Sequence, residues 1–122
     1  MKALVIDDSR AMRMILKSSL REMGYEVTEA TDGRNGMDML GAEGPFGLAL
    51  VDWNMPELSG IDFIEAVRLP PYSSTARLVM VTTETELPQV VRALAAGADE
   101  YVMKPFTKES IVEKLQLLGL EL

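Results

Sequence analysis

The segment LALVDWNMPELSG, residues 48–60, decides the fold because it begins with an unbroken apolar run that ends on the carboxylate of Asp52. A continuous apolar run predicts a strand buried on both faces of a parallel sheet. Asp52 closes the run, and a polar, proline-containing stretch leads into the helical pattern GIDFIEAVR at residues 60–68. A buried strand followed by a helix is the repeating unit of parallel sheets that are covered on both sides.

The same unit recurs along the chain in both directions. Strands are predicted at residues 3–6, 25–30, 46–52, 77–83 and 100–103, and helices from Ser9 to Gly24 and over residues 33–44, 60–68, 87–97 and 107–119. Five strands that alternate with five helices predict an α/β fold, with a five-stranded parallel sheet and helices on both faces.

Length and composition narrow the class of protein. The 122 residues suffice for one core, so we expect a single domain over residues 1–122. The sequence has neither a run of about 20 apolar residues nor a signal peptide, which predicts a cytoplasmic protein. A formal net charge of -7 disfavours nucleic acid and anionic membranes as partners. Without cysteine or histidine, nucleophilic triads are excluded and any metal must be held by oxygen atoms.

Polar side chains follow four of the predicted strands. Asp7 and Asp8 follow the first, Asp52 ends the third, Thr82 ends the fourth, and Lys104 follows the fifth. The carboxyl ends of parallel strands share one edge, where ligands of such sheets bind, so we expect these side chains to meet there. Three carboxylates beside one ammonium leave an excess of negative charge that a divalent cation would neutralise, and Mg²⁺ suits oxygen ligands. Together with a hydroxyl donor, this set predicts an aspartyl phosphate site.

Four motifs, VIDDS, LVDWNMPELSG, VMVTTE and YVMKPF, occur in this order, each at the end of its own strand. Together they span the chain and resemble the receiver domains of two-component response regulators, most closely those of chemotaxis systems. The resemblance implies the flavodoxin-like strand order 2-1-3-4-5, which is known for flavodoxin and for chemotaxis receivers. It also implies a signalling switch and not an enzyme, with self-phosphorylation and slow autodephosphorylation as its only chemistry.

The resemblance assigns a role to each acidic residue. Asp52 would accept a phosphoryl group from a sensor histidine kinase. Asp8 would bind Mg²⁺ directly and Asp7 through a water, while Asp52 and the backbone carbonyl of Asn54 would complete the protein ligands. Pro105 would follow a cis peptide bond, a conformation that is accessible mainly to X-Pro bonds.

The remaining roles concern the phosphoryl oxygens and the response to them. Thr82 and Lys104 would contact those oxygens, and Tyr101 would turn inward as Thr82 moves toward the phosphate. The surface changed by this coupling would comprise the fourth helix, the fifth strand and the fifth helix. Asn54 and Glu84 would set the rate of dephosphorylation.

The resemblance and the length of the chain together predict how the protein acts and which partners it has. Only 18 residues follow Lys104, so we expect no output domain and a monomer that acts by binding a downstream protein. A flagellar motor switch protein is the leading target, and a phosphatase is a further partner that the resemblance allows. The alternatives that stay open are a phosphate sink, a relay receiver, a receiver taken from a longer chain, and an adaptor that works without phosphorylation.

Rival interpretations exist for the site. An aspartyl-phosphate phosphohydrolase needs a second acid two positions after its nucleophile, where this chain has Asn54. A flavin-binding module needs a Ser/Thr/Gly-rich loop after the first strand, and the carboxylates of DDS would repel its phosphate. Structurally, Asp8 could cap the first helix and Tyr101 could simply pack. The methionines are interpreted as adaptable core residues, among them Met12, Met14, Met23, Met37 and Met39.

Overall fold

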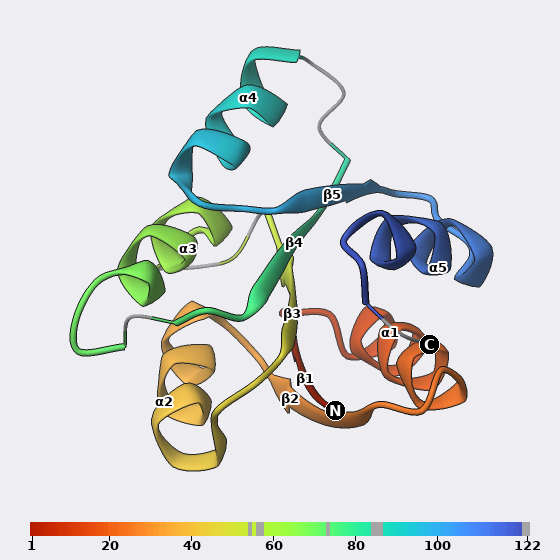
Figure 1. The fold of residues 1–122 in the computed structure, drawn as a ribbon, viewed down its shortest axis with the longest axis horizontal. Coiled ribbons are helices and arrows are strands. Elements are labelled where there is room, and N and C mark those ends of the chain that lie inside the picture. The colour runs from red at the N-terminus through yellow and green to blue at the C-terminus, as the bar shows by residue number, and fades with distance from the viewer. Residues whose placement is uncertain (54, 56–57, 73, 84–86, 121–122) are drawn as a thin grey trace.

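The computed structural model describes residues 1–53, 55, 58–72, 74–83 and 87–120. Within them, strands and helices alternate along the chain (Figure 1). The elements are β1 (Lys2–Ile6), α1 (Arg10–Glu22), β2 (Glu26–Ala30), α2 (Gly33–Glu43), β3 (Leu48–Asp52), α3 (Gly60–Arg68), β4 (Arg77–Thr82), α4 (Leu87–Ala96), β5 (Glu100–Met103) and α5 (Lys108–Leu117). The predicted alternation is confirmed, with boundaries that differ by only one or two residues at most ends.

The sheet has the order β2-β1-β3-β4-β5, and all its described pairings are parallel. This confirms the predicted five-stranded parallel sheet and its strand order. Because β1 pairs with both β2 and β3, the direction in which the chain adds strands reverses at β1. Ligands of such sheets bind outside the carboxyl ends of the strands at this reversal, so the fold itself singles out the ends of β1 and β3.

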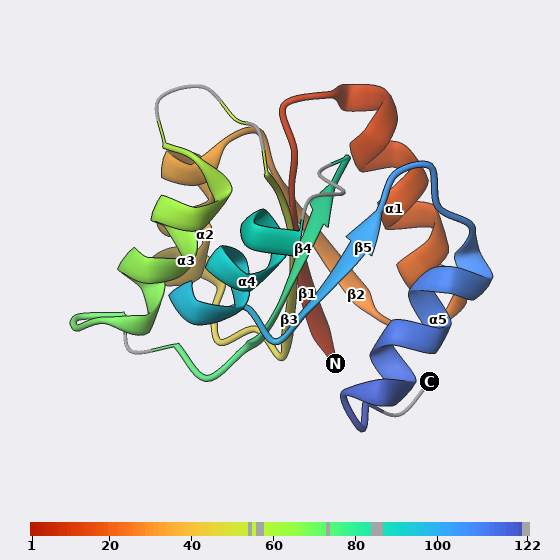
Figure 2. The same cartoon turned by 90° about the horizontal axis from the view of Figure 1, so that it is seen from above.

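Helices cover both faces of the sheet. In Figures 1 and 2, α1 and α5 lie on one face, while α2, α3 and α4 lie on the other. Side chains of successive strand residues alternate between the two cores. In β1, Leu4 and Ile6 belong to the core under α2, α3 and α4, whereas Ala3 and Val5 belong to the core under α1 and α5. Both faces of the sheet are therefore buried under helices, as the continuous apolar runs predict.

Local chemistry sets where the elements begin and end. Ser9 caps α1 by accepting a hydrogen bond from the Met12 N–H, and Gly24, with φ of 94°, ends that helix in the left-handed region. The second strand begins one residue later than predicted because the N–H of Tyr25 donates to the carbonyl of Leu20 and closes the end of α1.

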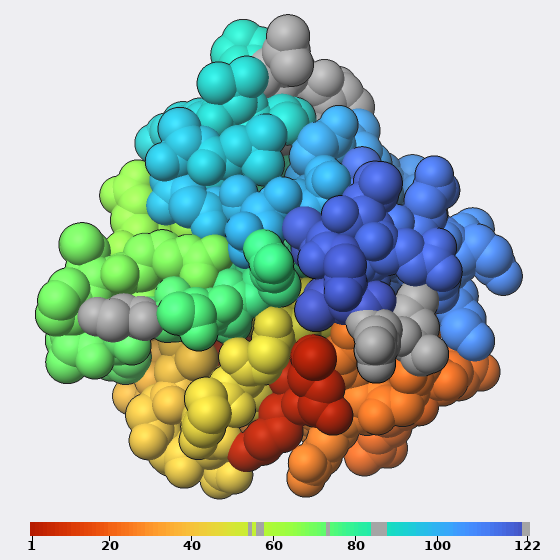
Figure 3. Space-filling view, in the orientation of Figure 1, coloured from red at the N-terminus to blue at the C-terminus, as the bar shows by residue number. Residues whose placement is uncertain are grey.

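The side chain of Arg68 connects three segments at the amino-terminal edge of the sheet by hydrogen bonds. The guanidinium of Arg68 donates to the carbonyls of Ser74, Ala76 and Gly97 and to the carboxylate of Asp99. These bonds connect the end of α3 with the segments that lead into β4 and β5. Figure 3 shows this edge, where the first residues of the chain (red) reach the surface beside the segment that leads into β3 (yellow). None of the helices in the described ranges has the length and apolar character needed to cross a membrane.

Candidate functional site

The five polar side chains predicted from the strand ends gather at the carboxyl edge of the sheet, toward which the strand arrows point in Figure 2. Asp7, Asp52 and Thr82 are buried, with exposed fractions of 1%, 6% and 2%, whereas Asp8 is exposed. One carboxylate oxygen each of Asp7, Asp8 and Asp52 lies within 4.8 Å of the other two. Residues 45 positions apart in sequence are thus brought into one acidic cluster, defined here as Asp7, Asp8 and Asp52.

Lys104 supplies the positive charge at this cluster. Its Nζ lies 3.1 Å from Oδ1 of Asp52 and 3.7 Å from Oδ2 of Asp7. Its backbone N–H donates to the carbonyl of Thr82 at 2.8 Å, so the end of β5 is fixed to β4 while the side chain reaches the carboxylates. The peptide bond between Lys104 and Pro105 is cis, as the resemblance implies.

Backbone contacts hold Asp7 in place. Its N–H donates to the carbonyl of Ala30 at 3.2 Å, and its own carbonyl accepts from Nη1 of Arg13 at 2.8 Å. Its Oδ1 accepts from the N–H of Ser9 at 2.8 Å, while its Oδ2 is buried and accepts no hydrogen bond from the described residues. A buried carboxylate oxygen without a donor is costly unless a cation compensates it.

The electrostatics of the cluster favour a further cation. Burial raises the pKa of Asp7 above its usual range, and the nearby charge of Asp52 acts in the same direction. The Ser9 N–H and the ammonium of Lys104 oppose this shift without cancelling it. Carboxylates that outnumber the ammonium, with a donor set made only of oxygen, fit a hard divalent cation such as Mg²⁺. The residues present therefore match the metal that the sequence predicts.

A tight connection follows Asp52. The N–H of Trp53 donates to the carbonyl of Val81 at 3.0 Å, and the carbonyl of Trp53 accepts from the N–H of Gly60 at 3.1 Å. A Cβ atom at Gly60 would lie 2.5 Å from the carbonyl oxygen of Asp52, closer than real Cβ contacts allow. Glycine is thus required where α3 begins against the end of β3. Trp53 itself is half-buried against the core under α2, α3 and α4.

Thr82 and Tyr101 lie on the same side of the sheet. Met80 pairs with Tyr101 and Thr82 pairs with Met103 in the register of β4 and β5. Since alternate residues share a face, Thr82, Met80 and Tyr101 all lie on the side covered by α4. The Tyr101 ring is half-buried, and the Nζ of Lys114 lies 4.5 Å from its centroid.

Some predictions are corrected or fall outside the described residues. Ser9 caps α1, so the interpretation of Asp8 as its cap is wrong. Met14 is 59% exposed and is not a core residue. The other four methionines named above, Met12, Met23, Met37 and Met39, pack against the two cores. Asn54 and Glu84, predicted to tune dephosphorylation, lie outside the described residues.

Sequence reasoning did not find the contacts that orient the site. The bond from Arg13 to the Asp7 carbonyl and the bond from Lys104 to the Thr82 carbonyl depend on tertiary placement. The bond from Ser9 to Oδ1 of Asp7 had a signal, because Asp side chains commonly accept from the N–H two residues later.

Comparisons with known proteins agree with this geometry. A family profile described as the response regulator receiver domain matches residues 3–116. The chain is similar to chemotaxis protein CheY1 of Helicobacter pylori, with 40% identity over 119 residues that cover 97% of this chain and 96% of the relative. It is also similar to chemotaxis protein CheY of Pseudomonas aeruginosa, with 41% identity over 117 residues that cover 95% and 94%.

A solved structure shows the same likeness in three dimensions. The structure of Vibrio cholerae chemotaxis protein CheY4 superposes with a TM-score of 0.87 at 34% identity, covering 95% of this chain and 96% of that chain. The similarity therefore extends over nearly the whole chain, including all the strand ends that form the acidic cluster.

Proposed function

The chain belongs to the response regulator receiver domain family, and from this premise we propose that it is a phosphorylation-activated switch whose phosphoryl acceptor is Asp52. The observation that carries the proposal is the acidic cluster with the ammonium of Lys104 between Asp52 and Asp7, at 3.1 Å and 3.7 Å. A carboxylate that merely ended a strand would need neither a second buried carboxylate nor a lysine from the edge strand. The relatives named as chemotaxis proteins support a role in two-component signalling of that kind.

In the proposed reaction, a carboxylate oxygen of Asp52 attacks the phosphorus of a phosphohistidine on a sensor kinase. An O–P bond forms, the N–P bond breaks, and the departing imidazole takes up a proton. The ammonium of Lys104, already 3.1 Å from Asp52, offsets negative charge as the phosphoryl oxygens approach. The burial of Asp52 limits access of water to the acyl phosphate that results.

Asp7, Asp8 and Asp52 would hold Mg²⁺, with the backbone carbonyl of Asn54 as a further predicted ligand. When bound, the metal would neutralise the charge that carboxylates and phosphoryl oxygens bring together. The buried Oδ2 of Asp7, which lacks a donor among the described residues, supports this assignment.

Phosphorylation of Asp52 would be coupled to the protein surface through movements of Thr82 and then of Tyr101. Both side chains lie on the α4 side of the sheet, two register positions apart, so a displacement of Thr82 toward the phosphate would open room next to Tyr101. The responding surface is formed by α4, β5 and α5, where Val91 and Leu94 are 53% and 42% exposed. Exposed apolar side chains on that surface suit a downstream protein, and the chemotaxis relatives make a flagellar motor switch the leading target.

Other outputs remain alternatives to motor binding. A phosphate sink or a relay receiver would use the same chemistry without that target, and a phosphatase would act on the acyl phosphate in either case. Asn54 and Glu84 are proposed to set its lifetime. A phosphohydrolase stays disfavoured because Asn54 stands where the second acid is needed.

The test uses the fluorescence of Trp53, the sole tryptophan, which directly follows Asp52. We expect Mg²⁺ to change the emission saturably, and acetyl phosphate or beryllium fluoride to change it further only when Mg²⁺ is present. Asp52→Asn should abolish the second change, whereas Asp38→Asn, on the exposed side of α2, should keep both. An unchanged intact mass after acetyl phosphate, together with silent fluorescence, would exclude Asp52 as the acceptor and leave an adaptor with the receiver fold.

A further inference from the structure

Helix α1 carries a row of cations on its outer face. Arg10, Arg13, Lys17 and Arg21, named here the basic row, are spaced by three or four residues and so lie on one side of the helix. They are four of the 12 lysine and arginine residues in a chain whose net charge is -7. The row is therefore a positively charged surface on a protein whose net charge is negative.

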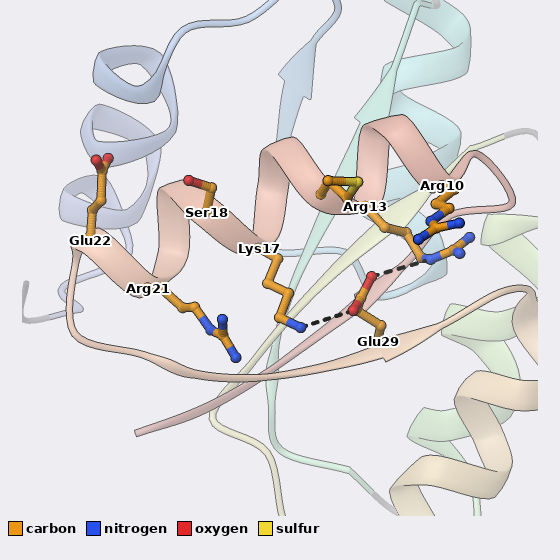
Figure 4. Close-up of a pocket in the computed structure, with 8 residues that line it drawn as sticks. Arg10, Arg13, Lys17, Ser18, Arg21, Glu22 and Glu29 are labelled. Atoms are coloured by element: carbon orange, nitrogen blue, oxygen red, sulfur yellow. Dashed lines mark hydrogen bonds and ion pairs between the residues drawn. The ribbon is translucent and has the colours of Figure 1, made fainter.

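The basic row borders an open groove between α1 and β2, with a volume of about 720 Å³. In Figure 4, Arg13 and Lys17 reach toward Glu29 on β2, and Arg21 points to the same side of the helix. Ser18 and Glu22 point away from β2. The groove is thus cationic along its length and has its floor at an edge strand of the sheet.

The positive charge of the row is only partly neutralised. Glu29 pairs with Nε of Arg13 at 3.4 Å and with Nζ of Lys17 at 3.1 Å. Glu22, which also borders the groove, pairs with Lys108 of α5 at 3.1 Å. Neither end of the row, Arg10 or Arg21, forms an ion pair with any described residue, so two guanidinium groups remain available for an anionic partner.

We propose that this groove is a docking surface for an acidic α-helix of a partner protein. Eleven residue steps from Arg10 to Arg21 correspond to about 16 Å of helix. A helix laid along α1 at a crossing angle of about 20° would present carboxylates with the same spacing of three or four residues. Guanidinium groups bind carboxylates in bidentate fashion, and Met14, 59% exposed beside the row, offers an apolar contact to the same helix.

The form of the groove argues against other anions. Small-molecule sites are enclosed and mostly apolar, whereas this groove is open and its lining is mostly charged. Extended polyanions such as nucleic acids meet the repulsion of a chain with net charge -7 outside the row. A helix of limited length that covers only the row avoids that repulsion.

The proposal does not depend on phosphorylation, so the test uses unphosphorylated full chain and repeats it with Asp52→Asn. The probe is a synthetic helical peptide with glutamates at positions 1, 4, 8 and 12 and one leucine between them, titrated into isotope-labelled protein while backbone amide shifts are recorded. We expect shifts confined to residues 10–22 and 26–30, and weaker binding at higher ionic strength. The same peptide with glutamine in place of glutamate should not bind.

Variants assign the binding to the row. Arg10→Gln combined with Arg21→Gln should weaken binding about tenfold and leave the contact from Arg13 to Asp7 intact. Arg92→Gln, an exposed cation on α4, should change it less than about twofold for its single charge. Equal losses in both variants, or amide shifts outside residues 10–22 and 26–30, would overturn the proposal. So would tighter binding of inorganic tripolyphosphate at the row, or the same shifts produced by concentrating the protein alone, because the occupant would then be a phosphate ligand or a second copy.

Discussion

Replacing Asp7 with asparagine is expected to make the metal-free protein more stable and to remove most of its stabilisation by Mg²⁺. Asp7 is 1% exposed, and its Oδ2 accepts no hydrogen bond from the described residues. Asparagine keeps the oxygen that accepts from the Ser9 N–H. Its amide can donate to the carboxylate of Asp52 or Asp8, both of which have an oxygen within 4.8 Å of the Asp7 carboxylate.

The magnitude follows from the charges around Asp7. With an effective dielectric constant of about 20, repulsion from Asp52 within 4.8 Å costs at least about 3.5 kcal/mol, and attraction from Lys104 at 3.7 Å returns about 4.5 kcal/mol. These two contributions nearly cancel. Asp8 is exposed, so water screens its charge and it adds only a smaller repulsion. The main remaining cost is the burial of the charge, a penalty of several kcal/mol before compensation. The Ser9 N–H compensates part of it, so we expect a gain of about 1–2 kcal/mol at neutral pH.

The raised pKa of Asp7 makes this gain depend on pH. The pKa of Asp7 is raised in the folded protein, so its charge opposes folding at pH values above that pKa. As the pH falls through the raised pKa, Asp7 becomes neutral in the unsubstituted protein as well. The advantage of Asp7→Asn should therefore shrink in acid.

Urea unfolding in EDTA and in saturating Mg²⁺ measures both effects. A gain of this size shifts the midpoint by roughly 0.5–1.5 M for the slopes usual in small proteins. Mg²⁺ at a hundred times its Kd should stabilise the unsubstituted protein by about 2.7 kcal/mol and Asp7→Asn by less than half of that. Asp38→Asn removes an exposed carboxylate and should alter neither value. A destabilised Asp7→Asn protein in EDTA, or one with the full gain from Mg²⁺, would refute the reasoning.

Three further substitutions test the geometry. Gly60→Ala places a Cβ 2.5 Å from the carbonyl oxygen of Asp52, so we expect a loss of about 1–3 kcal/mol in urea unfolding together with weaker Mg²⁺ binding in the fluorescence titration. Arg68→Met removes the guanidinium that joins three backbone segments and should cost about 2–4 kcal/mol in urea unfolding without changing Mg²⁺ affinity. Glu29→Gln should cost about 0.5–1 kcal/mol at neutral pH. The hydrogen bond from Lys17 lowers the pKa of Glu29 below its ordinary 4.5, so this difference in unfolding free energy should be full above pH 4.5 and vanish as the pH falls through the lowered pKa.

Each of these three has a matched control. Gly41→Ala adds a Cβ to α2 with no atom within 4 Å, and should not destabilise. Arg92→Met and Glu113→Gln remove exposed charges from helices and should stay within about 0.5 kcal/mol of the unsubstituted protein. A control that behaves like its partner would show that the added methyl group or the lost charge itself, and not the contact described, is responsible.

The architecture was predictable because its signals are local and strong. Strands buried on both faces leave unbroken apolar runs, and Gly24 and Gly97 occupy left-handed positions directly after helices. Boundaries were less accurate where tertiary bonds decide them. Phe46 is buried but lies outside β3, and the N–H of Gly47 donates to the carbonyl of Lys2 before the strand begins.

The site was predictable in its members but not in its arrangement. Placement at strand ends is enough to bring Asp7, Asp52 and Lys104 to one edge, since parallel strands end together. The spacing of residues carries no information on which carboxylate is buried, and it was the neighbouring backbone that made Asp7 the most enclosed of the three acids. The basic row had a clear signal in the spacing of its cations, but a charged helix face is usually only solvated. That two of its guanidinium groups form no ion pair with the part of the chain that the structure describes becomes apparent only in three dimensions.

The attachment of Lys104 has a consequence for the edge of the sheet. β5 has four residues and a neighbour on one side only, so its carboxyl end has few backbone bonds to restrain it. Among the described residues, Lys104 adds to the bond to Thr82 its ion pairs with two carboxylates, Asp52 at the end of β3 and Asp7 just after β1. Whatever changes the charge of those carboxylates also changes how firmly this edge strand is held, so the ionic state of the site and the order of β5 vary together. An edge strand anchored by charge in this way can transmit a chemical event to the surface without any hinge.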